Sequence, residues 1–263
     1  MNYLFNYLPK LSFALSGRST IRAFMLYASF VCFVFSRMIF TSLRKRDYII
    51  RGVYHGKEII YRLNQPIDTA PLIEVYVFKE YEWDCGFTPQ TILDLGAHFG
   101  DTALYYNVVY PNTKIIAVEP DPVNFERLKK NTAAYPNIIP VHCAVGAETG
   151  TITLFLAQNG LGHSTTARKE SHGSVQVAQA TIGEILGKQG LKSVDLIKFD
   201  IEGAEAVLFK NSMLAQMSRA FIGELHFDLN GELRMEDVNN SFKDLSVTLV
   251  PTLKKTRFII KAV

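Results

Sequence analysis

Acidic side chains and glycines stand together where apolar runs of this sequence end. The first such run is TILDLGAHFG (91–100), in which Asp94 falls among β-forming residues and is followed by Gly96 and Gly100. A strand that enters a helix through a glycine turn commonly holds a ligand there. The G-x-x-x-G spacing is not the G-x-G-x-x-G of dinucleotide sites, and no P-loop Gly-Lys-Ser/Thr occurs. The turn therefore predicts a ligand site of another kind.

The next apolar run supplies an acid where a ribose could be bound. KIIAVEPDP carries Glu119 at its end, 19 residues after Gly100. A carboxylate has two acceptor oxygens, and vicinal hydroxyls offer two donors. Glu119 could instead cap the following helix, although Asp121 is better placed for that role. A third run ends in Ala144, whose small side chain suits the flat face of a purine and equally a tight turn.

Two later runs end in further groups able to exchange protons. VDLIKFDIEG places Asp200 and Glu202 at its end, and FIGELHF carries Glu224 and His226. Side chains two apart in a strand share a face, so Glu224 and His226 are expected side by side. Acids at the carboxyl edge of a central strand contribute little to stability, so this pattern indicates function.

The chain from residue 91 onward alternates between strand and helix patterns. Strands are expected near 91–95, 114–118, 137–142, 194–199 and 220–226, and helices over 100–110, 122–134, 181–189 and 202–211. GTITLFLA (150–157) reads as part of a hairpin, and SVTLV and RFIIKAV as a closing antiparallel pair. Repeated strand–helix units predict a parallel sheet covered by helices, which the closing pair makes mixed. Ligands bind at the carboxyl ends of such strands.

The N-terminal part has a different character. YIIRGVYHGKEIIYRLN (48–64) predicts a hairpin, and 68–84 has helical spacing. AFMLYASFVCFVFS (23–36) is an uncharged run shorter than the roughly 20 residues of a membrane span. It could pack on the body, lie in a membrane interface, or span with Arg37 snorkelling.

Charge is divided unevenly along the 263 residues, of which 48% are hydrophobic. Residues 1–62 hold ten Lys/Arg and two Asp/Glu, or +8, which leaves −5 for the rest of a total of +3. This argues against nucleic acid as a partner of the body. It suits a flank, residues 1–46, that meets an anionic membrane surface, and equally a solubilising, partly disordered leader. Three cysteines without metal spacing indicate a reduced, cytoplasmic location.

The motifs ILDLGAHFGDTAL, VEPDPVNFERLKKN, TIGEIL, VDLIKFDIEGAEAVLFKN and GELH resemble the FkbM-type family of S-adenosylmethionine-dependent methyltransferases. The resemblance runs from about Tyr48 to the C-terminus. It implies a Rossmann-like class I methyltransferase fold with a mixed seven-stranded sheet. We expect an N-terminal helical extension (1–47), a hairpin and helix leading into the core (48–90), and the cofactor-binding domain (91–263).

The resemblance also implies a role for each motif residue. The methionine part of the cofactor would lie among Asp94, Gly96, His98 and Gly100, with the ribose on Glu119, the adenine beside Ala144, and the amino group or sulfonium near Asp200. Glu202 would anchor its loop or face the acceptor. His98 stands where the family often has Asn. It could contact the substrate, but its position in the turn makes a backbone-positioning role the expectation.

Methylation of an alcohol also needs a group that takes the hydroxyl proton. His163, in GLGHSTT, and His226 are the candidate bases, because histidine titrates near neutral pH. A metal-assisted version would place Mg²⁺ on Asp200, Glu202 and Glu224. We expect no metal, because the family pattern gives Glu202 and Glu224 other uses.

The expected activity is O-methylation of a hydroxyl on a sugar, glycan, glycolipid or secondary metabolite, with a small-molecule, saccharide or lipid-linked acceptor. Residues 157–178 look like the loop that selects it. Two alternatives stay open. One is a catalytically silent cofactor-binding module tethered to a membrane assembly, and the other is an NAD(P)-dependent oxidoreductase. The sequence gives no indication of the oligomeric state.

Overall fold

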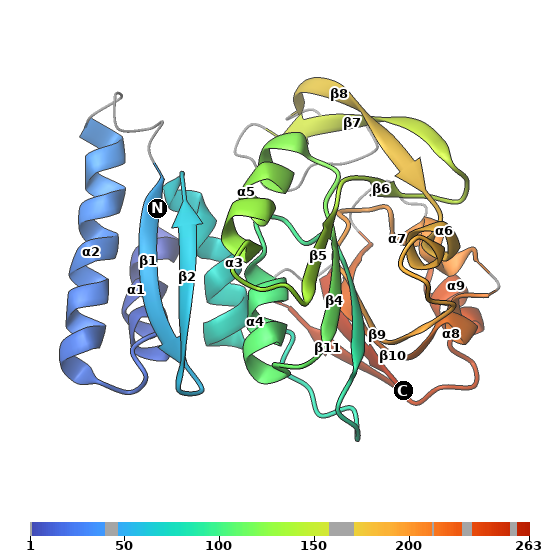
Figure 1. The fold of residues 1–263 in the computed structure, drawn as a ribbon, viewed down its shortest axis with the longest axis horizontal. Coiled ribbons are helices and arrows are strands. Elements are labelled where there is room, and N and C mark those ends of the chain that lie inside the picture. Colours follow the sequence, from blue (N-terminus) through green and yellow to red (C-terminus); the bar gives the residue numbers. More distant parts are fainter. Residues whose placement is uncertain (1, 40–46, 158–170, 212, 228–232, 253–256) are drawn as a thin grey trace. The chain divides into compact units, whose positions relative to one another are not determined.

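The computed structural model describes residues 2–39, 47–157, 171–211, 213–227, 233–252 and 257–263 (Figure 1). These fall into two compact units. The N-terminal unit comprises Met1–Glu82 and Leu104–Pro111, and the larger unit comprises Trp83–Ala103 and Asn112–Val263.

A seven-stranded mixed sheet forms the centre of the larger unit, as the sequence predicted. Its order is β11-β12-β10-β9-β3-β4-β5. The strands are β3 (Thr91–Leu95), β4 (Lys114–Val118), β5 (Ile138–Val141), β9 (Val194–Phe199), β10 (Ser218–His226), β11 (Val247–Pro251) and β12 (Arg257–Ala262). Strand β12 runs antiparallel to both β10 and β11, while β10, β9, β3, β4 and β5 pair in parallel. The carboxyl ends of β3, β4, β9 and β10 therefore meet at one edge.

Helices cover both faces of this sheet. They are α4 (Asp101–Val109), α5 (Pro122–Thr132), α6 (Ile182–Gly187), α7 (Glu205–Phe209), α8 (Leu214–Met217) and α9 (Met235–Ser241). Apolar side chains of α6 to α9, among them Leu186 and Phe209, join those of the strands in one buried core, and α5 lies on the opposite face (Figure 1). Helix α7 is shorter than expected because Glu202 and Gly203 have positive φ angles of 51° and 97°, which a helix cannot include.

A small second sheet belongs to the same unit. It consists of β6 (Ala144–Val145), β7 (Gly150–Ala157) and β8 (Ser171–Ala180), in the order β6-β8-β7. Strand β7 pairs antiparallel with β8, so the expected hairpin is present. The expected loop over 157–178 is wrong at its end, because β8 begins at Ser171, and the pairing of β6 with β8 was not predicted.

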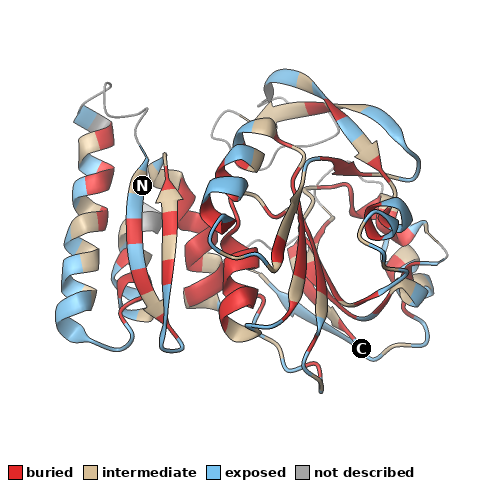
Figure 2. Cartoon of the chain, in the orientation of Figure 1, coloured by how far each residue is buried: buried red, intermediate tan, exposed pale blue. Residues whose placement is uncertain are grey.

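The N-terminal unit combines helices with a hairpin. Its elements are α1 (Asn2–Ala14), α2 (Thr20–Ile39), β1 (Tyr48–Tyr54), β2 (Lys57–Leu63), the short helical turns η2 (Pro66–Asp68) and η3 (Glu74–Phe78), and α3 (Thr69–Ile73). His55 and Gly56 connect the hairpin with φ angles of 47° and 76°, as a type I′ turn requires. The helix expected over 68–84 ends earlier, because Lys79 takes a left-handed conformation. Figure 2 shows buried residues on β1, β2 and α3.

The compact units are defined by contacts, and the domain bounds expected at residues 47 and 90 stay predictions. Residues 1–47 and the hairpin lie in one unit, which also includes Leu104–Pro111, a segment that begins within α4. Tyr105 lies edge-on to Tyr76 with ring centroids 5.9 Å apart, and Lys57 Nζ donates to the Val108 carbonyl at 3.1 Å. These contacts join residues that are distant in sequence, so local composition did not reveal them.

Candidate active site

The turn after β3 is held close to the ends of its two neighbouring strands. The N–H groups of Gly96 and Ala97 both donate to the Val118 carbonyl at 3.0 Å. Gly96 has a φ of 76°, and a Cβ there would lie 1.9 Å from the Asp200 carbonyl oxygen. The missing side chain of Gly96 therefore lets the turn approach the backbone that follows β9.

Glu119 joins the end of β4 to this turn. One carboxylate oxygen accepts the His98 N–H at 2.8 Å, and the other accepts the Asp121 N–H at 2.9 Å. Burial raises the pKa of Glu119 to about 8, although the two N–H donors act in the opposite direction. Asp121 itself caps α5 by accepting the Asn124 N–H at 2.7 Å. When ionised, Glu119 retains capacity for one more donor on each oxygen, which is what a ribose diol supplies.

Asp94 lies behind the turn, where it pairs with a buried lysine. Its carboxylate is 3.1 Å from Lys198 Nζ and accepts the Thr102 hydroxyl at 2.6 Å. Lys198 also donates to the Gly96 carbonyl at 2.8 Å. Burial alone would lower the pKa of Lys198, but the nearby carboxylates of Asp94, Asp200 and Asp101 raise it. Asp94 is fully buried, so it supports the turn from the protein side.

Lys198 was not predicted as a site residue, although the sequence contains a signal for it. Lys198 stands inside the apolar run DLIKF, where a charged residue needs a buried partner. Register supplies that partner, because Asp94 and Lys198 are opposite each other on β3 and β9.

His98 contributes its backbone more than its ring. Its φ is 49°, a left-handed conformation that directs its N–H to Glu119. The ring Nδ1 lies 3.8 Å from an oxygen of Asp101, whose pKa is raised to about 7 by burial.

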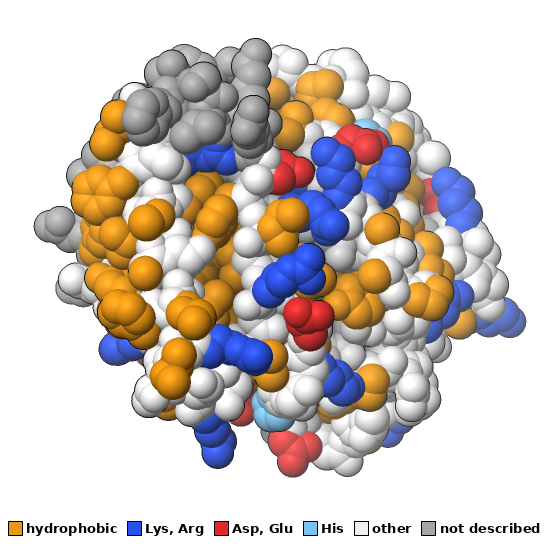
Figure 3. All heavy atoms as spheres, turned by 60° about the vertical axis from the view of Figure 1, so that its left-hand side comes forward, with side chains coloured by type: hydrophobic (Ala, Val, Ile, Leu, Met, Phe, Trp, Pro, Cys, Tyr) orange, Lys and Arg blue, Asp and Glu red, His pale blue; other side chains and the backbone are white. Residues whose placement is uncertain are grey.

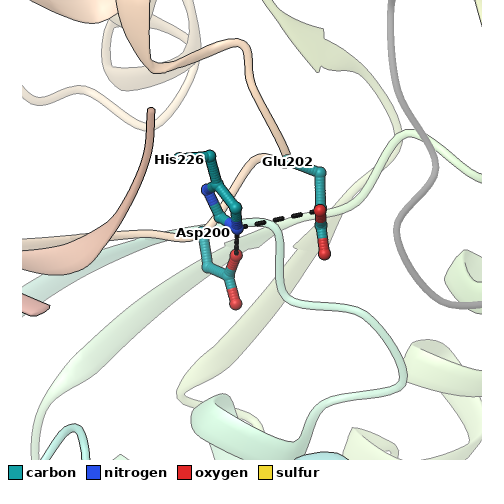
Figure 4. Close-up of side chains that lie close together, drawn as sticks. All are labelled: Asp200, Glu202 and His226. Carbon is teal, nitrogen blue, oxygen red and sulfur yellow. Dashed lines mark ion pairs between the residues drawn. The ribbon is translucent and has the colours of Figure 1, made fainter. Parts of the chain in front are cut away.

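A second cluster lies where β9 and β10 end. Figure 4 shows Asp200 and Glu202 converging on the His226 ring. His226 Nε2 is 3.8 Å from an oxygen of Asp200 and 3.7 Å from one of Glu202. His226 is fully buried, whereas about a quarter of the side-chain surface of Asp200 (27%) and Glu202 (25%) is exposed. The two carboxylates therefore reach solvent and the histidine does not.

Two further carboxylates and an arginine complete this cluster. His226 Nδ1 lies 2.8 Å from the buried Glu205, and Nε2 lies 3.2 Å from Glu224. Arg257 lies 3.9 Å from both Glu202 and Glu224. Burial alone would lower the pKa of His226, but the hydrogen bonds to Glu205 and Glu224 raise it to about 11. The imidazole is therefore a buried cation at neutral pH.

The cluster has more negative than positive charge. Four carboxylates face Arg257 and the His226 imidazolium, so the group carries about −2 with every carboxylate ionised. Oxygen atoms of Asp200 and Glu202 and a ring nitrogen of His226 lie within 4.8 Å of one another, close enough to hold a metal ion. A cationic ligand beside Asp200 and Glu202 would balance the excess negative charge of the cluster, as a metal ion would.

Glu205 and Arg257 are functional candidates that the sequence analysis missed. Glu205 was visible as the second glutamate of the D-I-E-G-A-E motif. Arg257 precedes an apolar strand, and only the antiparallel pairing of β12 with β10 brings it opposite His226.

The remaining candidates from the sequence are Ala144, Gly100 and His163. Ala144 is buried in the small sheet, where it packs with Leu154 and Val177. His163 lies outside the described residues, as does most of the loop 157–178. Gly100 has a φ of 95° and directly precedes α4. A Cβ at this position would lie 3.1 Å from the Leu128 side chain.

The acceptor groups at this edge of the sheet fit S-adenosylmethionine, which carries a ribose diol and, beside its own carboxylate, a sulfonium and an ammonium group. Glu119 has acceptor capacity for the diol, and the Asp200 cluster has negative charge for the cationic end. The strand order, with antiparallel β12 between β10 and β11, is that of a Rossmann-like class I methyltransferase.

Within that class, the chain belongs to the FkbM methyltransferase family. The family model described as "Methyltransferase FkbM domain" matches residues 94–245. The protein is therefore a methyltransferase, and its cofactor is S-adenosylmethionine.

Individual relatives are more distant. The chain is 29% identical over 176 residues to "Methyltransferase sdnD" of Sordaria araneosa, covering 54% of this chain and 68% of the relative. It is 26% identical over 184 residues to "Hexuronic acid methyltransferase AglP" of Haloferax volcanii, covering 68% of this chain and 71% of the relative. Among solved structures, Aeropyrum pernix fibrillarin with bound S-adenosyl-L-methionine is 16% identical over 82% of both chains, with a TM-score of 0.48.

Proposed function

We propose that this enzyme methylates a hydroxyl oxygen, and that the acceptor is a saccharide or a sugar-bearing glycolipid or secondary metabolite. The observation that carries the proposal is the pair of part-exposed carboxylates, Asp200 and Glu202, beside the buried His226. An alcohol must lose a proton as its oxygen is methylated, and these carboxylates are the solvent-reaching acceptors of the cluster. The name of the Haloferax volcanii relative supports a sugar acceptor.

Cofactor binding is assigned to Glu119 and Asp200. Glu119 would accept the two ribose hydroxyls, one on each oxygen, while its bonds from His98 and Asp121 keep the carboxylate oriented. Asp200 would face the cationic end, because a negative charge near a bound cation lowers its energy most where water is excluded. The cofactor, when bound, supplies a methyl group on a sulfonium that leaves as a neutral thioether.

Glu202 is the residue we assign as general base. Burial raises the pKa of Glu202, which makes its carboxylate a better proton acceptor than an exposed glutamate. His226 is a weaker candidate than the sequence suggested, since an imidazolium at neutral pH has no lone pair to offer. His226 would instead orient Glu202 and balance its charge at 3.7 Å. His163 stays a prediction of the sequence alone.

The cofactor site is tested by calorimetry with S-adenosylmethionine. Glu119→Ala should weaken binding at least tenfold, equivalent to about 1.4 kcal/mol. Glu126→Ala is the matched control, because Glu126 is an exposed acid on α5 that pairs with the exposed Lys129. NADH in the same cell tests the oxidoreductase alternative. Binding of NADH in place of S-adenosylmethionine would reject the proposal.

The reaction is tested by turnover with a panel of acceptors, including hexuronic acid glycosides, followed as S-adenosylhomocysteine release. Glu202→Gln should retain cofactor binding and lose about 10²–10⁴-fold in kcat. Cofactor binding by the wild type without turnover on any acceptor would favour the catalytically silent module.

The cellular location is part of the proposal. We infer a cytoplasmic enzyme, because all three cysteines are free and two of them, Cys85 and Cys143, are buried. A lipid-linked acceptor would then be met at a membrane surface, which fits the basic N-terminal part of the chain.

A further inference from the structure

We propose that the N-terminal unit binds an anionic lipid surface through the outward face of α2, with the helix lying in the plane of the membrane. The proposal rests on the structure of that unit alone and is independent of the methyl acceptor. It goes beyond the sequence analysis, which left three fates open for residues 23–36.

One face of α2 is part of the folded unit. Phe30, Phe33 and Val34 are buried on this face. Phe33 stacks on Tyr48 of β1 with ring centroids 4.3 Å apart, and the Arg37 guanidinium lies 5.3 Å from the Phe33 ring. Ser29 on the neighbouring turn also hydrogen-bonds Tyr48. These contacts fix which face of the helix remains outward.

The outward face of α2 is mostly apolar from Ile21 to Ile39, with the exposed Arg22 near its start. Its exposed large side chains are Ile21 (71%), Phe24 (72%), Met25 (61%), Phe35 (48%) and Ile39 (67%). Together with the exposed Ala28 and Cys32, these side chains form an apolar stripe. Positions 21, 25, 28, 32, 35 and 39 in this stripe follow helical spacing. Figure 3 shows hydrophobic side chains gathered on this side of the molecule with Lys and Arg beside them. An uncovered stripe of this length marks an interaction surface.

Charge identifies lipid as the partner. Residues 1–46 contain no Asp or Glu, and their basic residues are Lys10, Arg18, Arg22, Arg37, Arg44, Lys45 and Arg46. A second copy of the same surface would bring two such basic segments together, which costs electrostatic energy. An anionic membrane instead gains about 1 kcal/mol for each basic residue near its surface. The stripe and the charge therefore favour the same partner.

The inward contacts exclude a transmembrane orientation for the folded unit. By length and composition Thr20–Arg37 could cross a bilayer. However, Arg37 is buried and Ser29 bonds the hairpin, so a span would carry the hairpin's polar backbone edge into hydrocarbon or break these contacts. A helix with one face on protein and the other on lipid lies in the interface.

The experiment is co-sedimentation of the full chain with vesicles of phosphatidylcholine alone, and of equal parts phosphatidylcholine and phosphatidylserine. We expect the wild type to bind the anionic vesicles and to be released by high salt. The variant Phe24→Ser/Met25→Ser/Phe35→Ser should bind at least tenfold more weakly. The variant Arg18→Gln/Arg22→Gln should reduce binding to anionic vesicles specifically. The control Val123→Ser/Met213→Ser removes exposed apolar residues of the larger unit and should bind like the wild type.

Two measurements keep the result interpretable. Unchanged circular dichroism and unchanged S-adenosylmethionine affinity in every variant show that the fold is retained. Failure of the wild type to bind anionic vesicles would overturn the proposal. So would a self-association, seen by analytical ultracentrifugation, that the triple serine variant abolishes, because the stripe would then be a contact between copies of this chain.

Discussion

His226 is surrounded by carboxylates, and this decides which group in the cluster can take a proton. Its Nδ1 lies 2.8 Å from Glu205, which is itself fully buried and also accepts the Gly203 N–H at 3.2 Å. Glu205 and His226 are both buried and balance each other's charge, so a change in one of them alters the other. Glu205 is therefore a positioning residue, because it acts on Glu202 through His226.

Glu205→Gln should lower the pKa of His226 from about 11 towards its ordinary range, because the variant removes the carboxylate that hydrogen-bonds Nδ1 at 2.8 Å. A histidine whose pKa rises on folding stabilises the fold fully below its unfolded pKa of about 6.5. In the wild type, this stabilisation of the fold by His226 is lost as pH rises towards 11. In the variant, the stabilisation should be lost at a lower pH. The measurement is imidazole titration by NMR, with unfolding monitored across the same pH range.

Glu126→Gln serves as the control for this experiment, since its exposed carboxylate is distant in sequence from the cluster and pairs with Lys129. An unchanged His226 titration in Glu205→Gln would contradict the assignment of Glu205 as positioning residue.

Lys198→Met should destabilise the protein by about 3–5 kcal/mol, because it leaves the Asp94 carboxylate buried without its cation. The double variant Asp94→Asn/Lys198→Met should recover part of that loss, since neither charge is then buried alone. Urea unfolding of the two variants beside the wild type gives the comparison. A single variant within about 1 kcal/mol of the wild type would show that the pair does not support the turn.

At the scale of elements, the site depends on how closely β3 and β9 can end beside each other. The turn after β3 reaches the segment after β9 through Gly96 and through the Asp200 N–H, which donates to the Leu95 carbonyl at 3.0 Å. Asp200 is therefore held by the backbone of the cofactor turn. Any substitution that pushes the ends of β3 and β9 apart should move Asp200 away from both the turn after β3 and the His226 cluster.

Gly96→Ala should prevent cofactor binding and destabilise the fold, because its Cβ would lie 1.9 Å from the Asp200 carbonyl oxygen. Gly86→Ala is a matched control. Gly86 has a φ of 80°, close to the 76° of Gly96, and open space where a Cβ would stand. The control should lose only the about 1–2 kcal/mol that a left-handed alanine costs. Thermal unfolding and calorimetry of both variants measure the difference, and equal losses would refute the close-approach argument.

For the whole molecule, the larger unit combines a cofactor site with a cluster that could hold a metal ion. We expect the imidazolium of His226 to supply the local positive charge, so that no metal is required. The N-terminal unit, with 11 Lys/Arg and 6 Asp/Glu, has a net charge of +5 and carries the exposed stripe of α2. Catalysis and membrane attachment are thus assigned to different units.

S-adenosylmethionine should raise the melting temperature, because a ligand at about 100 times its Kd adds about 2.7 kcal/mol of stability. Addition of EDTA should change neither this shift nor the turnover. The measurement is thermal unfolding with and without chelator, followed by an assay with added Mg²⁺ or Mn²⁺. Loss of activity in EDTA that either metal restores would assign a metal to Asp200, Glu202 and His226.

The sequence by itself determined the elements and the edge of the sheet at which the chemistry lies. Alternating apolar runs and amphipathic segments depend on neighbouring residues, so β3, β4, β9 and β10 could be predicted from local pattern. Asp200 and His226 were expected to face the site because each ends a strand, and parallel strands end at one edge. The glycine turn predicted a ligand, and the motif order pointed to the family.

Tertiary structure alone decided which side chains meet. Gly96 and Lys198 are 102 positions apart, and strand register brings them within hydrogen-bonding distance. The same holds for Glu205 and His226, whose mutual burial changed the candidate base from a histidine to Glu202. Only packing showed that α2 has both a buried and an exposed apolar face. The physical reason is that periodicity is a local property of a chain, whereas burial, register and pKa depend on contacts between distant residues.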